Sequence, residues 1–268
     1  MIPIEKQVKK KTVLVLIPTL GERLDMLRNC LTSIFLHECD LRVVVIFPRR
    51  NYENMLAIKK QFPQVILEDQ DLKLIPAVNY VIQKNDDCEY FTWINDDDAL
   101  ANNCIQRGLS ELELNLKIIG TYGAIEYIDQ NGREIGRWNP PRFAHSVNFF
   151  IPSAVKAEGS LFRMSVIQKI GEIPSFVHAS VGDIYLITRA VQIGKLKKLS
   201  GLPVAKFRIH DDSLTTHSPF KVNLTAYKLQ LKLGSTLQRI FITVLGPIFI
   251  FAKLMVLKVM FFKAKVHF

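Results

Sequence analysis

Short apolar runs alternate along the first half of the chain with segments whose apolar residues recur every three or four positions. The β-branched run TVLVLI predicts a buried strand over 12–17, and the leucines that follow at helical spacing predict a helix over 22–36. The same alternation continues and predicts three more strands and three more helices: strands at 41–47, 65–67 and 90–94, and helices at 51–61, 74–82 and 102–116.

Strands that alternate with helices build right-handed βαβ units around a mostly parallel sheet, so the predicted fold class is α/β. In open sheets of this kind, ligands bind at the carboxyl ends of the strands. Two polar segments fall at such ends, PTLGER at 18–23 and NDDDAL at 95–100. The pattern therefore predicts a functional site where these two segments meet.

The second half of the chain is less regular. Asn131-Gly132 is a strong hairpin signal between apolar segments at 118–128 and 134–138. Short helices are expected at 165–170 and 183–193, because a glycine follows each of them. An extended segment then leads to the polar group His210-Asp211-Asp212.

The composition excludes a disordered protein and several kinds of site. The chain has 268 residues, of which 49% are hydrophobic, so it can bury a core as one large domain or one domain with an appendage. The four cysteines form no closely spaced pair, which gives no support to a zinc ribbon or a dithiol site and favours a reducing compartment. The charged start MIPIEKQVKKK lacks the apolar stretch of a secretory signal.

The net charge of +10 is concentrated near the C-terminus. The segment 220–268 contains eight Lys and Arg residues, no Asp or Glu, and seven of the 17 phenylalanines. We therefore divide the sequence into a globular domain at 1–219 and a basic, apolar segment at 220–268.

Within that segment, residues 240–257 contain one charged residue, Lys253. A helix of this length is about 27 Å long, which is marginal for a hydrocarbon core of ~30 Å, and Gly246-Pro247 is expected to kink or break it. We therefore expect an amphipathic helical tail that associates with an anionic membrane surface through 237–268. The alternative is a helix packed on the protein's own domain, and nucleic acid is a poorer partner for so apolar a segment.

Three consecutive carboxylates, Asp96, Asp97 and Asp98, follow the predicted strand at 90–94. Like charges this close require a positive partner, and Mg²⁺ or Mn²⁺ bound with a nucleotide diphosphate is a suitable one. Side chains two apart in an extended segment point to the same side, so Asp96 and Asp98 can face one ion. The alternative is a solvated acidic turn that caps the next helix, and the DQD segment at 69–71 has the same spacing after another strand.

Two further residues are candidates for chemistry. Asp183 opens a predicted helix, where it is either an N-cap or a general base for an attacking hydroxyl. His210 ends the extended segment beside two acids, where it is either structural or a ligand of a metal or phosphate. The motifs of P-loop, dinucleotide-binding, HExxH and GxSxG proteins are missing from the sequence.

Taken together, four blocks between residues 12 and 215 resemble the inverting glycosyltransferases of family 2, which have the GT-A nucleotide-sugar fold. In order, the blocks are TVLVLIPTLGERLDMLRNCLTSI, IPAVNYVIQKNDDCEYFTWINDDDAL, AEGSLFRMSVIQKIGEIPSFVHASVGDIYLITRAVQIG and FRIHDDSLT. The resemblance favours the acids at 96–98 over those at 69–71.

The resemblance implies a role for each candidate residue. Pro18, Thr19, Glu22, Asn79, Asp96 and Asp97 would bind the nucleotide-sugar, Asp98 and His210 would bind the metal, Asp183 would be the catalytic base, and Gly159 and Ser160 would lie beside the acceptor. The cofactor would be a divalent cation, Mn²⁺ or Mg²⁺.

Two positions depart from the family's pattern. In that family the second strand commonly ends in an acidic pair that holds the nucleotide's base or ribose. In this chain the second predicted strand ends in FPRR at 47–50. The catalytic motif commonly reads Glu-Asp, whereas Gly182 precedes Asp183 here. Recognition of the base must therefore differ, and the supporting carboxylate is missing.

The expected function is transfer of a sugar from a nucleotide-diphosphate donor to a hydroxyl of a glycan or lipid-linked acceptor, with inversion, in cell-surface polysaccharide synthesis. The expected location is the cytoplasm, peripheral on the inner face of the cell membrane. The alternatives are a sugar-1-phosphate nucleotidyltransferase of related fold, which lacks support because 18–23 contains one glycine, and an inactive membrane-bound scaffold.

Overall fold

The computed structural model describes residues 12–213 and 218–265 of the chain. Three parts of the sequence-based interpretation lie outside the described residues. They are the basic start at 1–11, the end of the FRIHDDSLT block at 214–215, and the last residues of the predicted membrane-associated segment, 266–268.

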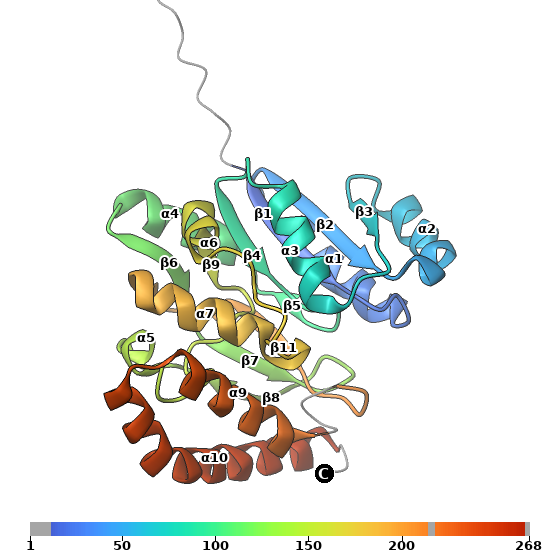
Figure 1. Cartoon of the computed structure of the whole chain (residues 1–268). Coiled ribbons are helices and arrows are strands. Elements are labelled where there is room, and N and C mark those ends of the chain that lie inside the picture. Colours follow the sequence, from blue (N-terminus) through green and yellow to red (C-terminus); the bar gives the residue numbers. More distant parts are fainter. Residues whose placement is uncertain (1–11, 214–217, 266–268) are drawn as a thin grey trace, which may run out of the picture.

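The central feature is a seven-stranded sheet with the strand order β10-β6-β9-β4-β1-β2-β3 (Figure 1). Neighbouring strands are parallel except at β9, which is antiparallel to both β4 and β6. The bounds of these strands are β1 Val13–Pro18, β2 Leu41–Phe47, β3 Ile66–Asp69, β4 Tyr90–Trp93, β6 Ile118–Tyr122, β9 Leu161–Arg163 and β10 Lys195–Lys198. The predicted α/β class with a mostly parallel central sheet is confirmed.

Helices cover both faces of this sheet, because β1 places alternate apolar side chains on opposite sides. Leu14 and Leu16 belong to the core beneath α3, α6 and α7, whereas Val13 and Val15 belong to the core beneath α1, α2 and α4. The helix bounds are α1 Leu24–Phe35, α2 Tyr52–Gln61, α3 Leu74–Lys84, α4 Cys104–Leu114, α5 Ala144–Val147, α6 Met164–Ile170 and α7 Gly182–Ile193.

A second, four-stranded sheet has the order β5-β11-β7-β8. Its strands are β5 Ala99–Leu100, β7 Ile125–Ile128, β8 Glu134–Trp138 and β11 Ala205–Arg208. The predicted hairpin joins β7 to β8. The apolar segments 118–128 and 195–209 each divide between the two sheets, a change of direction that the hydrophobic pattern does not show.

The C-terminal segment packs on the domain as two helices, α9 Pro219–Leu233 and α10 Thr236–Ala264. Ala226 and Leu229 of α9 belong to the core beneath α3, α6 and α7, so α9 is part of the fold. A capping box between Ser235 and Gln238 begins α10. The helix continues through Pro247, and Figure 1 shows that α10 bends along its length.

In the described part of the chain, α10 is the one helix long and apolar enough to cross a membrane. Its length of about 44 Å exceeds a hydrocarbon core of ~30 Å. Its contacts with α9 and β8 place it against the domain along the bottom of Figure 1.

Candidate functional site

A cavity of about 1100 Å³ lies at the carboxyl ends of β1, β2 and β4. Its walls come from the loops after these strands, from residues 151–158, from the start of α7, from the end of β11, and from α9 and α10. Six of the candidate residues line it: Pro18, Thr19, Glu22, Asp96, Asp97 and Asp183. The two polar segments expected at the strand ends thus share one cavity with the proposed base.

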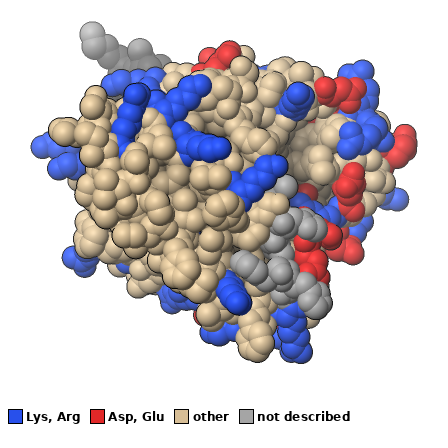
Figure 2. Space-filling model, turned by 60° about the horizontal axis from the view of Figure 1, so that its bottom comes forward, with Lys and Arg blue, Asp and Glu red and all other residues tan. Residues whose placement is uncertain are grey.

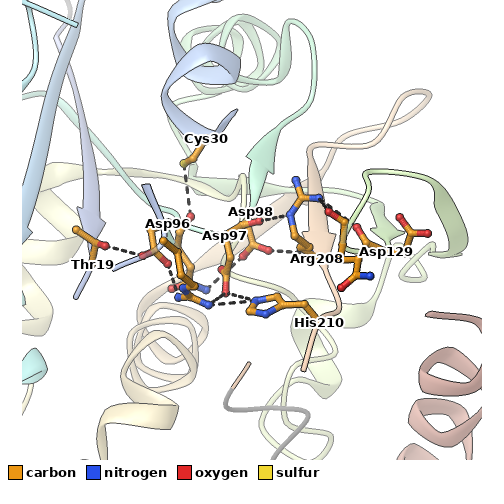
Figure 3. A network of polar contacts seen from close by, with 11 residues as sticks. Thr19, Cys30, Asp96, Asp97, Asp98, Asp129, Arg208 and His210 are labelled. Atoms are coloured by element: carbon orange, nitrogen blue, oxygen red, sulfur yellow. Dashed lines mark hydrogen bonds and ion pairs between the residues drawn. The ribbon is translucent and has the colours of Figure 1, made fainter. Parts of the chain in front are cut away.

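The acidic segment after β4 is held in a network of charged hydrogen bonds (Figure 3). Thr19 donates its hydroxyl hydrogen to Asp96 at 2.5 Å. The guanidinium of Arg23 donates to Asp96 at 2.6 Å and to Asp97 at 3.0 Å. The Nε2 atom of His210 lies 3.0 Å from the same Asp97 oxygen. The strand-end loops of β1, β4 and β11 are therefore joined at this point.

Asp98 points away from the cavity and is 1% exposed. Its carboxylate accepts the backbone N–H of Arg208 at 2.9 Å and the side-chain amide of Asn95 at 3.3 Å. Arg208 also donates from Nε to the carbonyl of Asp97. Asp98 thus fixes the turn that presents its neighbours. Its assignment as the main metal ligand stays a prediction, and the geometry favours Asp97 for that role.

Burial and charge shift the pKa values of these acids in different directions. Burial, together with the charge of Asp97, raises the pKa of Asp96 to about 6, although Arg23 and Thr19 act against this. Burial and the charges of Asp97 and Glu158 raise the pKa of Asp98 well above its usual range. Burial alone would raise the pKa of Asp97, but His210 and Arg23 outweigh it and lower that pKa. Asp97 is thus the member of the trio that stays ionised most readily.

Asp183 lies in the first turn of α7 and faces a second charged group, formed by Lys156, Glu158 and Lys253. Burial raises the pKa of Asp183, with the two lysines acting against it. The ammonium of Lys156 lies over the ring of Phe207 at 5.3 Å. Lys253 of α10 reaches the carbonyl of Pro152 at 3.4 Å. The sequence interpretation did not include Lys156 or Glu158 in the site.

The departure at Gly182 has a packing reason. A Cβ atom at this position would lie 2.6 Å from Cδ1 of Ile75 and 3.3 Å from the ring of Trp93, so a larger residue requires the Ile75 side chain to shift. Trp93 is the last residue of β4 and lines the cavity. The second carboxylate near Asp183 comes instead from Glu158, whose pKa is raised by burial and also by the charge of Asp183.

Five candidate residues do not line the cavity: Asp98 and His210, which join the charged network beside it, and Asn79, Gly159 and Ser160, which lie elsewhere. The side chain of Asn79 binds the backbone N–H and carbonyl of Ile173, both at 2.9 Å, and so joins α3 to the segment after α6. Ser160 is fully buried and donates to the carbonyl of Lys156 at 2.5 Å. Gly159 has φ +70°, and a Cβ there would lie 2.5 Å from the carbonyl oxygen of Val204. These contacts give Asn79, Gly159 and Ser160 structural roles, and the nucleotide and acceptor contacts expected of them stay predictions.

The rival acids at 69–71 serve a surface contact. Asp69 and Asp71 accept hydrogen bonds from the side chain and backbone of Arg49, at 3.0 and 3.1 Å. Arg50 lies 3.8 Å from Glu22. The two arginines after β2 therefore lie near acids of neighbouring loops, and of these acids Glu22 lines the cavity.

The sequence analysis assigns no role to Arg23, although the sequence contains a signal for one. Arg23 follows Glu22 in the polar segment after β1, which is predicted to meet the acidic cluster, and a cation in that segment is a natural partner for the acids. Lys253, the only charge in the apolar segment 240–257, also lines the cavity, and the sequence pattern predicts no such role for it.

The side-chain chemistry of Asp96, Asp97 and His210 fits Mn²⁺ or Mg²⁺, because carboxylate oxygens and an imidazole nitrogen suit such ions. The arrangement is not that of a formed metal site, and no group of three or more His, Cys, Asp or Glu side chains in 12–213 and 218–265 has that geometry. The guanidinium of Arg23 lies among the three candidate ligands instead.

Solved structures of sugar transferases have the same overall architecture. *Staphylococcus aureus* TarS, residues 1–349, superposes with a TM-score of 0.58 at 11% identity over 86% of this chain and 69% of that one. Its complex with UDP-GlcNAc gives 0.58, also at 11% identity, over 86% and 70%. The mannosyltransferase PcManGT from *Pyrobaculum calidifontis*, in complex with GDP-Man and Mn²⁺, gives 0.54 at 15% identity over 83% and 65%.

The fold is that of a GT-A glycosyltransferase. Comparison with protein-family models and with curated proteins gave no match to the sequence. At these identities the structural likeness establishes the GT-A fold, and the chain spans about two thirds of the length of the mannosyltransferase. The strand-end cavity is thus located in a fold that carries nucleotide-sugar transferases.

Proposed function

We propose that this chain is a metal-dependent inverting glycosyltransferase that moves a sugar from a nucleotide-diphosphate donor to an acceptor hydroxyl. The observation that carries the proposal is that Thr19, Asp96 and Asp97 line the same cavity as Asp183. One part of this cavity offers groups suited to a cation and a diphosphate, and another offers the half-buried carboxylate of Asp183, which is suited to proton transfer.

On the donor side, the protein's own groups hold the nucleotide end of the substrate. Asp96 and Asp97 are fixed by Thr19 and His210, and their oxygens face the cavity. A bound Mn²⁺ or Mg²⁺ would act as a Lewis acid toward the departing diphosphate. The apolar residues Phe47 and Pro48 line the adjoining wall, where a family member commonly has acids, so the base is expected to pack on an apolar surface.

On the acceptor side, Asp183 accepts the proton of the attacking hydroxyl. Burial raises the pKa of this carboxyl, which makes it a stronger base than a solvated aspartate. The hydroxyl oxygen forms a bond to the anomeric carbon as the bond to the diphosphate breaks on the opposite face. A single displacement of this kind inverts the configuration, and the charges of Lys156 and Lys253 favour the ionised form of Asp183.

The tail carries the argument for a membrane-associated acceptor. One side of α10 presents a row of large apolar side chains at helical spacing that are 44–84% exposed: Leu237, Phe241, Val244, Ile248, Phe251, Met255, Val259 and Phe262. We call this row the α10 stripe. Figure 2 shows the bottom face of the molecule, where α10 lies. This face is largely uncharged, with Lys and Arg scattered over it and acidic residues gathered at one side.

An exposed apolar row of this length requires a partner, because isolated soluble proteins seldom leave such a surface in water. The absence of Asp and Glu from 220–268 makes an anionic membrane surface the complementary partner. The opposite side of α10 lines the cavity through Lys253, Phe249 and Leu257. The same helix thus meets the membrane and the acceptor region, which favours a lipid-linked or cell-surface glycan acceptor at the inner face of the cell membrane.

The proposal is tested by thermal melting with UDP-, GDP- and dTDP-sugars, with and without Mn²⁺. A ligand that binds the native state raises the melting temperature, so one donor class should give a metal-dependent increase. Asp97→Asn should abolish that increase. Asp25→Asn is the matched control, because Asp25 is an exposed aspartate in the first turn of α1 that pairs with Arg28.

Two outcomes would count against the proposal. An equal increase in Asp97→Asn would show that the nucleotide binds elsewhere. No increase with any donor, together with no release of nucleoside diphosphate, would favour the inactive scaffold.

A further inference from the structure

Arg23 occupies the centre of the acidic cluster. Its guanidinium contacts Asp96 at 2.6 Å, Asp97 at 3.0 Å and Nε2 of His210 at 3.1 Å. These are the same three side chains whose chemistry suits a divalent cation. The protein thus places its own cation where its candidate metal ligands converge.

This arginine differs from the other arginine of the cluster in its freedom to move. Arg208 binds the backbone carbonyls of Asp97, Asp129 and Gln130 and has a side chain locked between two loops (Figure 3). Arg23 binds side chains of the cluster alone, and its own side chain is 30% exposed. It can therefore leave the cluster toward the cavity without breaking a backbone contact.

The backbone position of Arg23 also favours such a movement. Arg23 is the N-cap residue of α1, with φ −106° and ψ 62°, and its carbonyl accepts the N–H of Leu27. The side chain therefore starts from the positive end of a helix, where an incoming phosphate is also favoured. A guanidinium released from two carboxylates can bind phosphate oxygens with the same paired geometry.

We propose that Arg23 is a resident counterion that a divalent metal and a nucleoside diphosphate displace together. This inference rests on the proposed function. Without nucleotide, the metal competes with the guanidinium for Asp97 and His210 and binds weakly. When the diphosphate is present, Arg23 gains a new anionic partner, so the metal and the nucleotide strengthen each other's binding by the same factor.

The experiment measures free Mn²⁺ by electron paramagnetic resonance during titration of the full chain, first alone and then with UDP or GDP. Arg23→Gln should bind Mn²⁺ alone about ten-fold more tightly than the wild type, because a charged hydrogen-bonding competitor is gone. Arg23→Lys keeps the positive charge without the paired donors, so its affinity for Mn²⁺ alone should lie between those of Arg23→Gln and the wild type. Arg28→Gln, which removes a surface arginine from α1, should match the wild type.

The gain from adding nucleotide should also be smaller in Arg23→Gln than in the wild type. Equal or weaker Mn²⁺ binding by Arg23→Gln and Arg23→Lys, with melting curves that show folded protein, would overturn the inference. If nucleotide still binds the wild type in that case, the proposed function stands and the inference alone fails. If Arg23→Gln gains Mn²⁺ affinity but no variant binds nucleotide, the proposed function fails and the competition between arginine and metal holds.

Discussion

The two ends of the cavity are built in different ways. The donor end is made of neighbouring residues, Asp96 and Asp97, whose oxygens are bound by Thr19, Arg23 and His210. The acceptor end gathers charged side chains from three distant segments, and a carboxylate oxygen of Glu158 has no hydrogen-bond partner among the described residues. The end proposed to bind the donor is thus preorganised by protein contacts, whereas the end proposed to bind the acceptor leaves an oxygen of Glu158 without a protein partner among the described residues.

The largest expected effect tests the acceptor end. Asp183→Asn should lower kcat by about 10²–10⁴-fold, because it removes the general base, while donor binding stays unchanged. Sugar transfer and donor binding are measured on the same preparation. Asp25→Asn should retain full activity. Full turnover in Asp183→Asn would move the base to another residue, with Glu158 as the nearest candidate.

The second effect tests whether the α10 stripe serves a membrane. Replacing Ile248, Phe251 and Met255 by Ser should lower partitioning onto anionic vesicles by about 100-fold, if each side chain loses about 1 kcal/mol of apolar burial. Vesicle sedimentation measures this.

The control replaces Leu114 and Leu116, which are exposed apolar residues away from α10, and should leave partitioning unchanged. The triple variant could instead partition onto vesicles as well as the wild type but be monomeric where the wild type is dimeric. That outcome would show that the stripe is an interface between two copies of the chain.

The third effect concerns the loop that carries Glu158. Gly159→Ala should lower the free energy of unfolding by about 2–4 kcal/mol, because the Cβ meets the backbone of Val204 in addition to the strain of a positive φ. Gly132→Ala has a similar φ with open space around it, and should cost about 1 kcal/mol. Denaturant unfolding measures both, and equal losses would show that crowding at Gly159 is relieved elsewhere.

The smallest effect concerns Lys253, whose pKa is lowered to about 7 by burial and by the charge of Lys156. The unfolded chain binds this proton more tightly, so wild-type stability should rise as the pH rises from about 7 toward 10. Lys253→Met should be about 1–2 kcal/mol more stable than the wild type at pH 7, with the gap closing at higher pH. Lys258→Met, at an exposed position on the same helix, should show no such gap. A constant gap would mean that Lys253 is ionised throughout.

More of the residues predicted for the donor side than for the acceptor side line the cavity, for a physical reason. Strand, turn and acids are contiguous at 90–98, so the hydrophobic pattern and the motif locate the same place. The roles of Asn79 and Gly159 depend on contacts with Ile173 and Val204, far away in the chain, which no local pattern records. The direction in which Asp98 points depends likewise on Arg208, more than a hundred residues later.

The tail shows the same limit. Its apolar composition was evident, but whether α10 leaves the domain or packs on it depends on the inner face that includes Ile242 and Lys253. One side of α10 packs on the domain, as the alternative expected, and the association of the exposed stripe with a membrane stays a prediction.

The claim that donor and acceptor ends face each other across one cavity is tested most directly by the stereochemistry of the released sugar. The donor that raises the melting temperature is incubated with the enzyme, and the anomeric configuration of the first product, with water or a glycan as acceptor, is read by proton NMR before mutarotation. A single displacement promoted by Asp183 predicts a product of inverted configuration. Asp183→Asn should form far less of this product. A retained configuration would contradict the account.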